Sequence, residues 1–292
     1  TPLHCYWSCP ANEQFVAEEV TSTQGLVAEA EAHFQDLACL WIRGLIPNKL
    51  TKDVLDLWPP PEDLQLVTSS VGSAAVNISG TITIYGDASG GKFTSIASLR
   101  RVGVGIVCID QEGNLVWGQR SNLPGKVQTV ARGELFAILR AAQLAEENSN
   151  VDFVTDNLGN CTKFNSGKER ALLSNNGDMF KLLYEEFFVK HLNFSVRWMP
   201  SHHERKGVDL PPEVTPLDVK GNELADNHAE LAAEAHVINL NASTAVLNYA
   251  SLAKRIQKRN VCILASLEAR KKGDICKTDK ILAKQPDPTV LF

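Results

Sequence analysis

The chain has 292 residues, of which 44% are hydrophobic and 22% charged, and this composition excludes disorder throughout and a collagen-like repeat. The net charge of −5 excludes a uniformly basic nucleic-acid coat. The charge is uneven, however, with −7 in residues 1–80, −4 in residues 81–236 and +6 in residues 237–292. We therefore expect three functional segments along the chain.

The seven cysteines are scattered and odd in number, which indicates reduced thiols in an intracellular protein of the nucleus or cytoplasm. No apolar stretch is long enough to span a bilayer, so we expect no membrane partner. The chain begins at Thr1 without a charged and apolar leader, and we expect it to be a fragment of a longer polypeptide.

The first 80 residues are the least regular part of the sequence. Glu13 to Arg43 has apolar residues at mostly helical intervals, which predicts a helix, and we assign residues 1–68 to a helical N-terminal segment. Residues 69–80 are small and polar, which is typical of a linker.

Residues 81–236 have a regular pattern of strands and helices. Strands are predicted over Thr81 to Tyr85, Val102 to Ile109, Leu115 to Arg120, Val151 to Thr155 and Phe194 to Met199. Helices are predicted over Gln128 to Glu147, Met179 to His191 and Gly221 to His236, the last with Asn222 as its N-cap. This order predicts an α/β fold with a five-stranded mixed sheet, in which three antiparallel strands are followed by two parallel ones, flanked by helices. Residues 237–292 are expected to form a basic helical tail.

Four carboxylates lie where burial makes them costly. Asp87 and Asp156 follow the ends of two strands that we expect to be parallel neighbours, and Glu134 leans toward the buried face of its helix. Asp226 lies in the first turn of the last helix. Carboxylates that converge without Lys or Arg repel one another, and divalent cations that prefer oxygen ligands relieve the repulsion. The pattern predicts a metal-dependent cleft that acts on phosphodiesters.

Each acid also has a structural interpretation. Asp87 can begin a turn, Asp156 can cap a helix, Glu134 can be exposed and Asp226 can complement a helix dipole. Singly, each alternative explains its residue at least as well. Four such coincidences in this strand and helix order favour the functional interpretation.

Four segments resemble the signature segments of type 1 ribonuclease H: Tyr85–Ser89, Ala131–Leu135, Val154–Asn157 and Gly221–Asp226. Trp198–His202 resembles the strand and histidine loop of that family. The resemblance covers roughly residues 81–236, which makes this region the expected catalytic domain.

The resemblance implies a ribonuclease H-like fold and an RNA–DNA hybrid ribonuclease. Such an enzyme is an endonuclease that hydrolyses the RNA strand of the hybrid by two-metal-ion catalysis and leaves 5′-phosphate and 3′-hydroxyl ends. The implied catalytic and metal-coordinating acids are Asp87, Glu134, Asp156 and Asp226, with two Mg²⁺ ions, or Mn²⁺ in their place. His202 is implied as the loop histidine that assists product release, although a solvated surface histidine is the alternative.

Contacts to nucleic acid are predicted at Thr129, Arg132 and Asn157. Thr129 precedes a helix whose N–H groups could hold a phosphate, and Arg132 could add a charge. An N-cap threonine and an exposed arginine are equally good interpretations. The tail could also bind phosphates, or be a solvated helix, through its basic residues Lys254, Arg255, Lys258, Arg259, Arg270, Lys271 and Lys272.

The segment His4–Pro10 is similar to the His-x-x-x-x-Cys-Pro segment that often follows the polymerase region of non-LTR retrotransposon reverse transcriptases. This similarity implies the C-terminal part of a reverse transcriptase-like polyprotein, with an upstream reverse transcriptase domain as a partner. His4, Cys5 and Cys9 do not complete a tetrahedral zinc site, so none is predicted. The alternative function is a catalytically decayed module of a retroelement protein that only binds nucleic acid.

Overall fold

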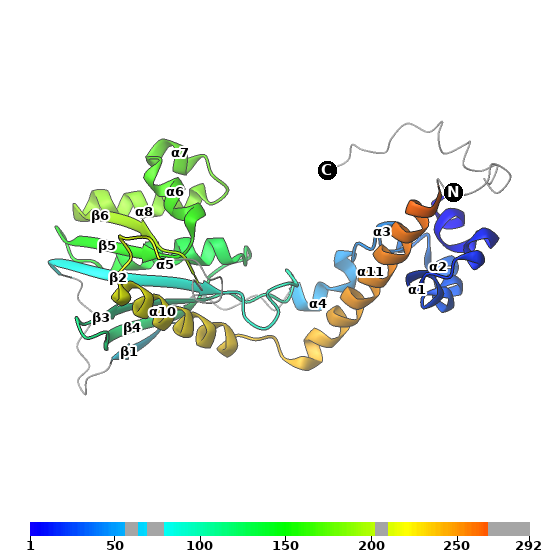
Figure 1. The fold of residues 1–292 in the computed structure, drawn as a ribbon, viewed down its shortest axis with the longest axis horizontal. Coiled ribbons are helices and arrows are strands. Elements are labelled where there is room, and N and C mark those ends of the chain that lie inside the picture. Colours follow the sequence, from blue (N-terminus) through cyan, green and yellow to red (C-terminus); the bar gives the residue numbers. More distant parts are fainter. Residues whose placement is uncertain (56–63, 69–78, 202–209, 268–292) are drawn as a thin grey trace. The chain divides into compact units, whose positions relative to one another are not determined.

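The computed structural model describes residues 1–55, 64–68, 79–201 and 210–267 (Figure 1). The chain divides into two compact units. The larger unit spans residues 57–239, and the smaller one combines residues 1–56 with residues 240–292.

The larger unit is built on a six-stranded mixed sheet with the strand order β1-β4-β3-β2-β5-β6. The strands are β1 (Leu64–Thr68), β2 (Thr81–Ser89), β3 (Gly103–Ile109), β4 (Leu115–Asn122), β5 (Asn150–Thr155) and β6 (Asn193–Trp198). Strands β1 to β4 pair in antiparallel fashion, whereas β5 and β6 run parallel to β2. The five predicted strands are confirmed, with three antiparallel strands followed by two parallel ones.

Strand β1 was not predicted, because the sequence analysis assigned its residues to the helical N-terminal segment. It is an edge strand that pairs with β4 from Leu64 opposite Ser121 to Thr68 opposite Trp117. Its five residues form a strand through pairing with a distant partner, and so short a segment carries little local pattern of its own.

Strand β2 is longer than predicted. Its parallel pairing with β5 ends at Tyr85 opposite Val154, but its antiparallel pairing with β3 continues to Ser89 opposite Gly103. Asp87 therefore lies within the strand, where we expected it to follow the strand's end. At this point β2 has lost β5 as a ladder partner, which leaves that side of the strand open for side chains.

Helices cover both faces of the sheet (Figure 1). One face carries α5 (Val130–Leu144), α6 (Leu158–Asn165), α7 (Lys168–Leu172) and α8 (Gly177–Lys190), and the other carries α10 (Pro216–Ala235). Ile84, Leu135 and Phe153 belong to the core under α5, whereas Tyr85 and Ala225 belong to the core under α10.

Helix α10 begins five residues earlier than predicted, and its N-cap is Thr215 rather than Asn222. The Thr215 side chain accepts a hydrogen bond from the Asp218 backbone N–H at 3.2 Å, and the Asp218 carboxylate accepts one from the Thr215 N–H at 2.8 Å. This reciprocal capping box satisfies two backbone donors that would otherwise lack partners.

Two glycines of β3 let α10 lie directly on the sheet. A Cβ added to Gly103 would come within 2.2 Å of the Ala229 carbonyl oxygen, and one added to Gly105 would come within 2.3 Å of the Ala225 carbonyl oxygen. Only glycine permits so close an approach, so these two positions fix the height of α10, and of Asp226 next to Ala225, above the sheet.

The smaller unit consists of short helices and one long helix. The short helices are η1 (His4–Ser8), η2 (Pro10–Gln14), α1 (Glu18–Thr21), η3 (Gln24–Leu26), α2 (Val27–His33), α3 (Ala38–Arg43), η4 (Asn48–Leu50) and α4 (Lys52–Leu55), and the long one is α11 (Leu240–Leu267). The single helix predicted over Glu13 to Arg43 is thus wrong. One cause is Thr23, whose hydroxyl donates to the Glu19 carbonyl at 2.7 Å and so competes with continued helix.

The N-terminal helices and α11 share one core. Trp7, Leu40 and Trp41 pack with Ala253 and Ile256 of α11, and the two tryptophan rings meet edge to face with centroids 5.2 Å apart. Among the described residues, no helix is both long and apolar enough to cross a lipid bilayer.

Arg259 of α11 does not belong to a phosphate-binding surface. Its side chain is fully buried and donates to the backbone carbonyls of Tyr6 and Val20, each at 2.9 Å. Its guanidinium also lies 4.8 Å from the centroid of the Trp7 ring. Arg259 therefore ties the N-terminal segment to α11. Lys254, Arg255 and Lys258 are exposed, while Arg270, Lys271 and Lys272 lie outside the described residues.

Candidate metal centre

Three predicted acids meet at the open side of β2. Asp87 lies on β2, Glu134 lies on α5, and Asp156 directly follows β5. Each offers a carboxylate oxygen, and these oxygens lie within 4.8 Å of one another. Asp87 and Glu134 are 7% and 3% exposed, whereas Asp156 is half-buried, so the group opens toward solvent on the Asp156 side.

The packing of α5 explains why Glu134 joins the two strand acids. A Cβ added to Gly133 would lie 2.5 Å from Val102 and 2.7 Å from the Cβ of Ala88, so this glycine lets the helix press against the sheet. Glu134 follows at once and is thereby brought next to Asp87. The Thr155 hydroxyl donates to the Glu134 carboxylate at 3.5 Å.

The electrostatics of this group favour protons or cations. Burial raises the pKa of Asp87 to about 7; a hydrogen bond with Glu134 acts against this rise, and the charges of Asp156 and Asp226 add to it. Burial also raises the pKa of Glu134, and the Asp87 carboxylate adds to that rise. The charges that act on both groups come from other carboxylates, so the site holds unbalanced negative charge when every acid is ionised.

Asp226 lies at the margin of the group. It sits on α10, is half-buried, and is near enough for its charge to raise the pKa of Asp87. It does not belong to the three acids whose oxygens all lie within 4.8 Å of one another. The structure therefore brings the carboxylate oxygens of three of the four acids within 4.8 Å of one another and places the fourth acid at their edge. His202 lies outside the described residues.

Each predicted nucleic-acid contact has a structural partner. Thr129 is the N-cap of α5 and accepts from the Arg132 N–H at 3.3 Å. The Arg132 guanidinium pairs with Asp178 at 2.9 Å, which raises the pKa of Arg132. Asn157 caps α6 and accepts from the Asn160 N–H at 2.9 Å. The first contact matches the N-cap interpretation of Thr129, whereas Arg132 is half-buried rather than exposed.

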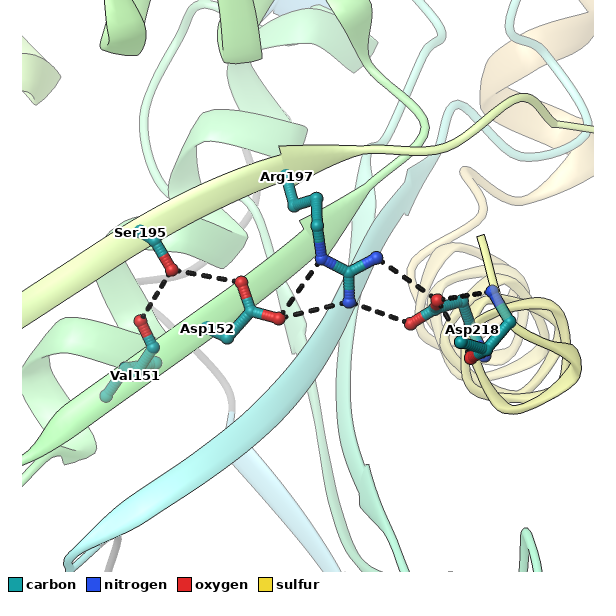
Figure 2. A network of polar contacts seen from close by, with 6 residues as sticks. Val151, Asp152, Ser195, Arg197 and Asp218 are labelled. Carbon is teal, nitrogen blue, oxygen red and sulfur yellow. Dashed lines mark hydrogen bonds and ion pairs between the residues drawn. The ribbon is translucent and has the colours of Figure 1, made fainter. Parts of the chain in front are cut away.

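A polar network that was not predicted joins the elements that carry Asp156 and Asp226. Arg197 of β6 binds Asp152 of β5 at 3.0 Å and Asp218 of α10 at 2.9 Å, and Ser195 donates to Asp152 at 3.0 Å (Figure 2). The Thr215-x-x-Asp218 spacing is a capping-box signal that was available in the sequence. Burial acts to raise the pKa of Asp218, but hydrogen bonds from Arg197 and Thr215 outweigh it and leave that pKa below its ordinary value.

Comparisons with known proteins give matches among solved structures. No protein-family model matches the chain, and no curated protein does. The RNase H domain of prototype foamy virus matches at 19% identity and a TM-score of 0.39, covering 53% of this chain and 94% of that one. RNase H1 from the archaeon Halobacterium salinarum matches at 15% identity and a TM-score of 0.37, covering 53% of this chain and 99% of that one.

The foamy virus protease-reverse transcriptase matches at 18% identity and a TM-score of 0.37, covering 60% of this chain and 23% of that one. At this level of similarity, function has to be argued from the site itself. The larger unit has the predicted α/β fold, in which three antiparallel strands are followed by two parallel ones in a mixed sheet flanked by helices, and β1 is an additional edge strand.

Proposed function

We propose that the larger unit is a metal-dependent endonuclease that hydrolyses the RNA strand of RNA/DNA hybrids and leaves 5′-phosphate and 3′-hydroxyl ends. The observation that carries this proposal is the convergence of Asp87, Glu134 and Asp156 within 4.8 Å, with Asp226 at their edge. Buried carboxylates that face one another cost stability unless protons or cations neutralise them. Such a cost is expected where the acids serve a reaction.

The donor set fits Mg²⁺ or Mn²⁺. The three converging groups supply oxygen ligands, which hard divalent cations prefer. When bound, two such ions polarise the scissile phosphate, provide the nucleophile and stabilise the leaving oxygen. We propose Asp87 and Glu134 as the buried ligands and Asp156 and Asp226 as the ligands on the side open to substrate.

The chain's own residues hold these acids in place before substrate arrives. The Ala88 backbone N–H donates to the Asp87 carboxylate at 2.7 Å, which orients one of its oxygens. The Thr155 hydroxyl faces Glu134, and the Asn157 N–H donates to that hydroxyl at 3.1 Å. We propose that Thr129, Arg132 and Asn157 contact the hybrid, and that His202 assists product release.

We also propose that the enzyme belongs to the type 1 subclass of ribonuclease H. We propose that the chain comes from a non-LTR retrotransposon reverse transcriptase-like polyprotein with an upstream polymerase domain, and that it acts in the nucleus or cytoplasm. The segment His4–Pro10 supports the polyprotein origin by its similarity alone.

The test is a cleavage assay with the full chain. RNA/DNA hybrid, duplex DNA and duplex RNA are incubated in the same buffer with Mg²⁺, Mn²⁺ or EDTA, and the product ends are identified. We expect hybrid cleavage that requires the metal and is lost in Asp156→Asn. Asp110→Asn, in the exposed β3–β4 turn, is the matched control and should cleave normally.

Two results count against the proposal. Cleavage that persists in EDTA would exclude the metal mechanism. Binding of hybrid without cleavage at millimolar Mn²⁺ would favour the decayed nucleic-acid-binding module.

A further inference from the structure

Strand β6 carries none of the four acids, yet two of its consecutive residues contact the elements that do. Trp198 lies in register with Thr155, the last residue of β5. Its indole Nε1 donates a hydrogen bond to the backbone carbonyl of Asp156 at 3.0 Å. The Leu158 N–H donates to the same carbonyl at 3.1 Å, so two donors fix the peptide unit of a predicted metal ligand.

Arg197 acts on the opposite face of β6, because successive side chains of a strand point to opposite faces. Its Nε and Nη2 donate to one oxygen of Asp152 at 3.2 and 3.0 Å, and its Nη1 and Nη2 donate to both oxygens of Asp218 at 3.1 and 2.9 Å (Figure 2). The Asp218 side chain is 2% exposed, and its charge is stabilised by this partner together with the hydrogen bonds from Thr215.

Arg197 joins β5 and α10, and these two elements lead to the two less buried acids, Asp156 and Asp226. Asp156 follows Asp152 by four residues, which is about 13 Å along an extended chain. Asp226 follows Asp218 by eight residues, which is about 12 Å along a helix. The charges of both acids raise the pKa of Asp87. The end of β5 and helix α10 therefore both lead from Arg197 to the same group of acids. Gly105, under Ala225, provides a second point of support for α10.

We infer that Trp198 and Arg197 are positioning residues for the metal centre: Trp198 fixes Asp156, and Arg197 fixes the direction of the helix that carries Asp226. This inference rests on the proposed metal site, but not on the nature of the substrate. Hydrogen-bond partners of metal ligands set ligand orientation, and their removal typically weakens metal binding by about tenfold or more.

The experiment measures Mn²⁺ binding to the full chain without nucleic acid, by titration calorimetry. Trp198→Phe keeps an aromatic ring but removes the indole donor, and we expect several-fold weaker Mn²⁺ binding. The matched control is Trp117→Phe, at a buried tryptophan of β4 in the same sheet. We expect that control to lower the melting temperature and to leave Mn²⁺ affinity unchanged.

Arg197→Lys provides a second arm if Trp198→Phe does not fold. Lysine keeps the charge but loses the bidentate geometry, whereas Arg197→Met removes both. We therefore expect Mn²⁺ binding to be weakened less in Arg197→Lys than in Arg197→Met. The control is Lys190→Met, which removes another half-buried cation that ties α8 to α5. In cleavage assays, the Mg²⁺ concentration for half-maximal rate should rise for Trp198→Phe, while KM for the hybrid stays constant.

The outcomes separate this inference from the proposed function. Unchanged Mn²⁺ affinity in Trp198→Phe and Arg197→Met overturns the inference alone. Wild-type protein that binds Mn²⁺ but does not cleave overturns the nuclease proposal and leaves the positioning role standing. Wild-type protein that binds no Mn²⁺ overturns both.

Discussion

Replacing Asp87 by asparagine should stabilise the metal-free protein at alkaline pH. The pKa of Asp87 is about 7 in the folded protein against 3.8 for an ordinary aspartate. The unfolded chain therefore ionises this group at lower pH than the native protein does, so stability is lost as pH rises from about 4 to about 7. Asparagine keeps an oxygen acceptor for the Ala88 N–H and carries no charge.

The size of the effect follows from the pKa difference. About three pKa units at about 1.4 kcal/mol each give about 4 kcal/mol as an upper bound, and about 2–3 kcal/mol of it falls between pH 5 and pH 8. The raised pKa of Glu134 also lowers the stability of the folded protein as pH rises, but Glu134 is present in both the wild type and Asp87→Asn. The comparison therefore measures the Asp87 contribution together with the part of the Glu134 pKa rise that the Asp87 carboxylate causes.

The assay is urea denaturation of both proteins in EDTA at pH 5 and pH 8, followed by circular dichroism. We expect the stability advantage of Asp87→Asn over wild type to grow by about 2–3 kcal/mol between the two pH values. Added Mn²⁺ should raise the stability of the wild type at pH 8 by mass action, and should raise that of the variant much less. The reasoning is refuted if the difference between the two proteins is the same at both pH values.

Three further predictions concern the supports of the site and the smaller unit. Gly105→Ala places a Cβ against the Ala225 carbonyl, so we expect the free energy of unfolding to fall by about 1–3 kcal/mol in urea denaturation and Mn²⁺ binding to weaken. Unchanged stability would mean that α10 does not lie so close to β3. Thr215→Ala removes the N-cap and should cost about 1 kcal/mol, measured by thermal denaturation, with no loss if α10 begins elsewhere. Arg259→Met removes the buried donor to the Tyr6 and Val20 carbonyls and should destabilise the smaller unit by about 1–3 kcal/mol, read by hydrogen exchange in α11, without changing hybrid affinity. The reverse pattern would restore the phosphate-binding interpretation.

The sequence was most informative where local pattern and tertiary structure agree. Alternating and β-branched residues predicted the five strands from β2 to β6, because these patterns can be read from a few neighbouring residues. The approach of Asp87 to Asp156 followed from strand order, since neighbouring parallel strands bring their carboxyl ends to one edge, and Glu134 was placed near them by the buried face of its helix.

The sequence was least informative where a distant partner decides the outcome. Strand β1 depends on β4, and β2 extends past Asp87 because β3 continues beside it. Arg259 has the sequence environment of an exposed basic residue, but backbone carbonyls from the N-terminal segment bury it. The Arg197 network joins residues from three elements, and only its Thr215-x-x-Asp218 part had a local signal.

The most direct test of the metal centre is anomalous diffraction from crystals of the full chain grown with Mn²⁺. The account predicts an anomalous peak among the carboxylates of Asp87, Glu134 and Asp156, with a second peak on the side of Asp226. Saturating Mn²⁺ with no peak between these carboxylates would contradict it.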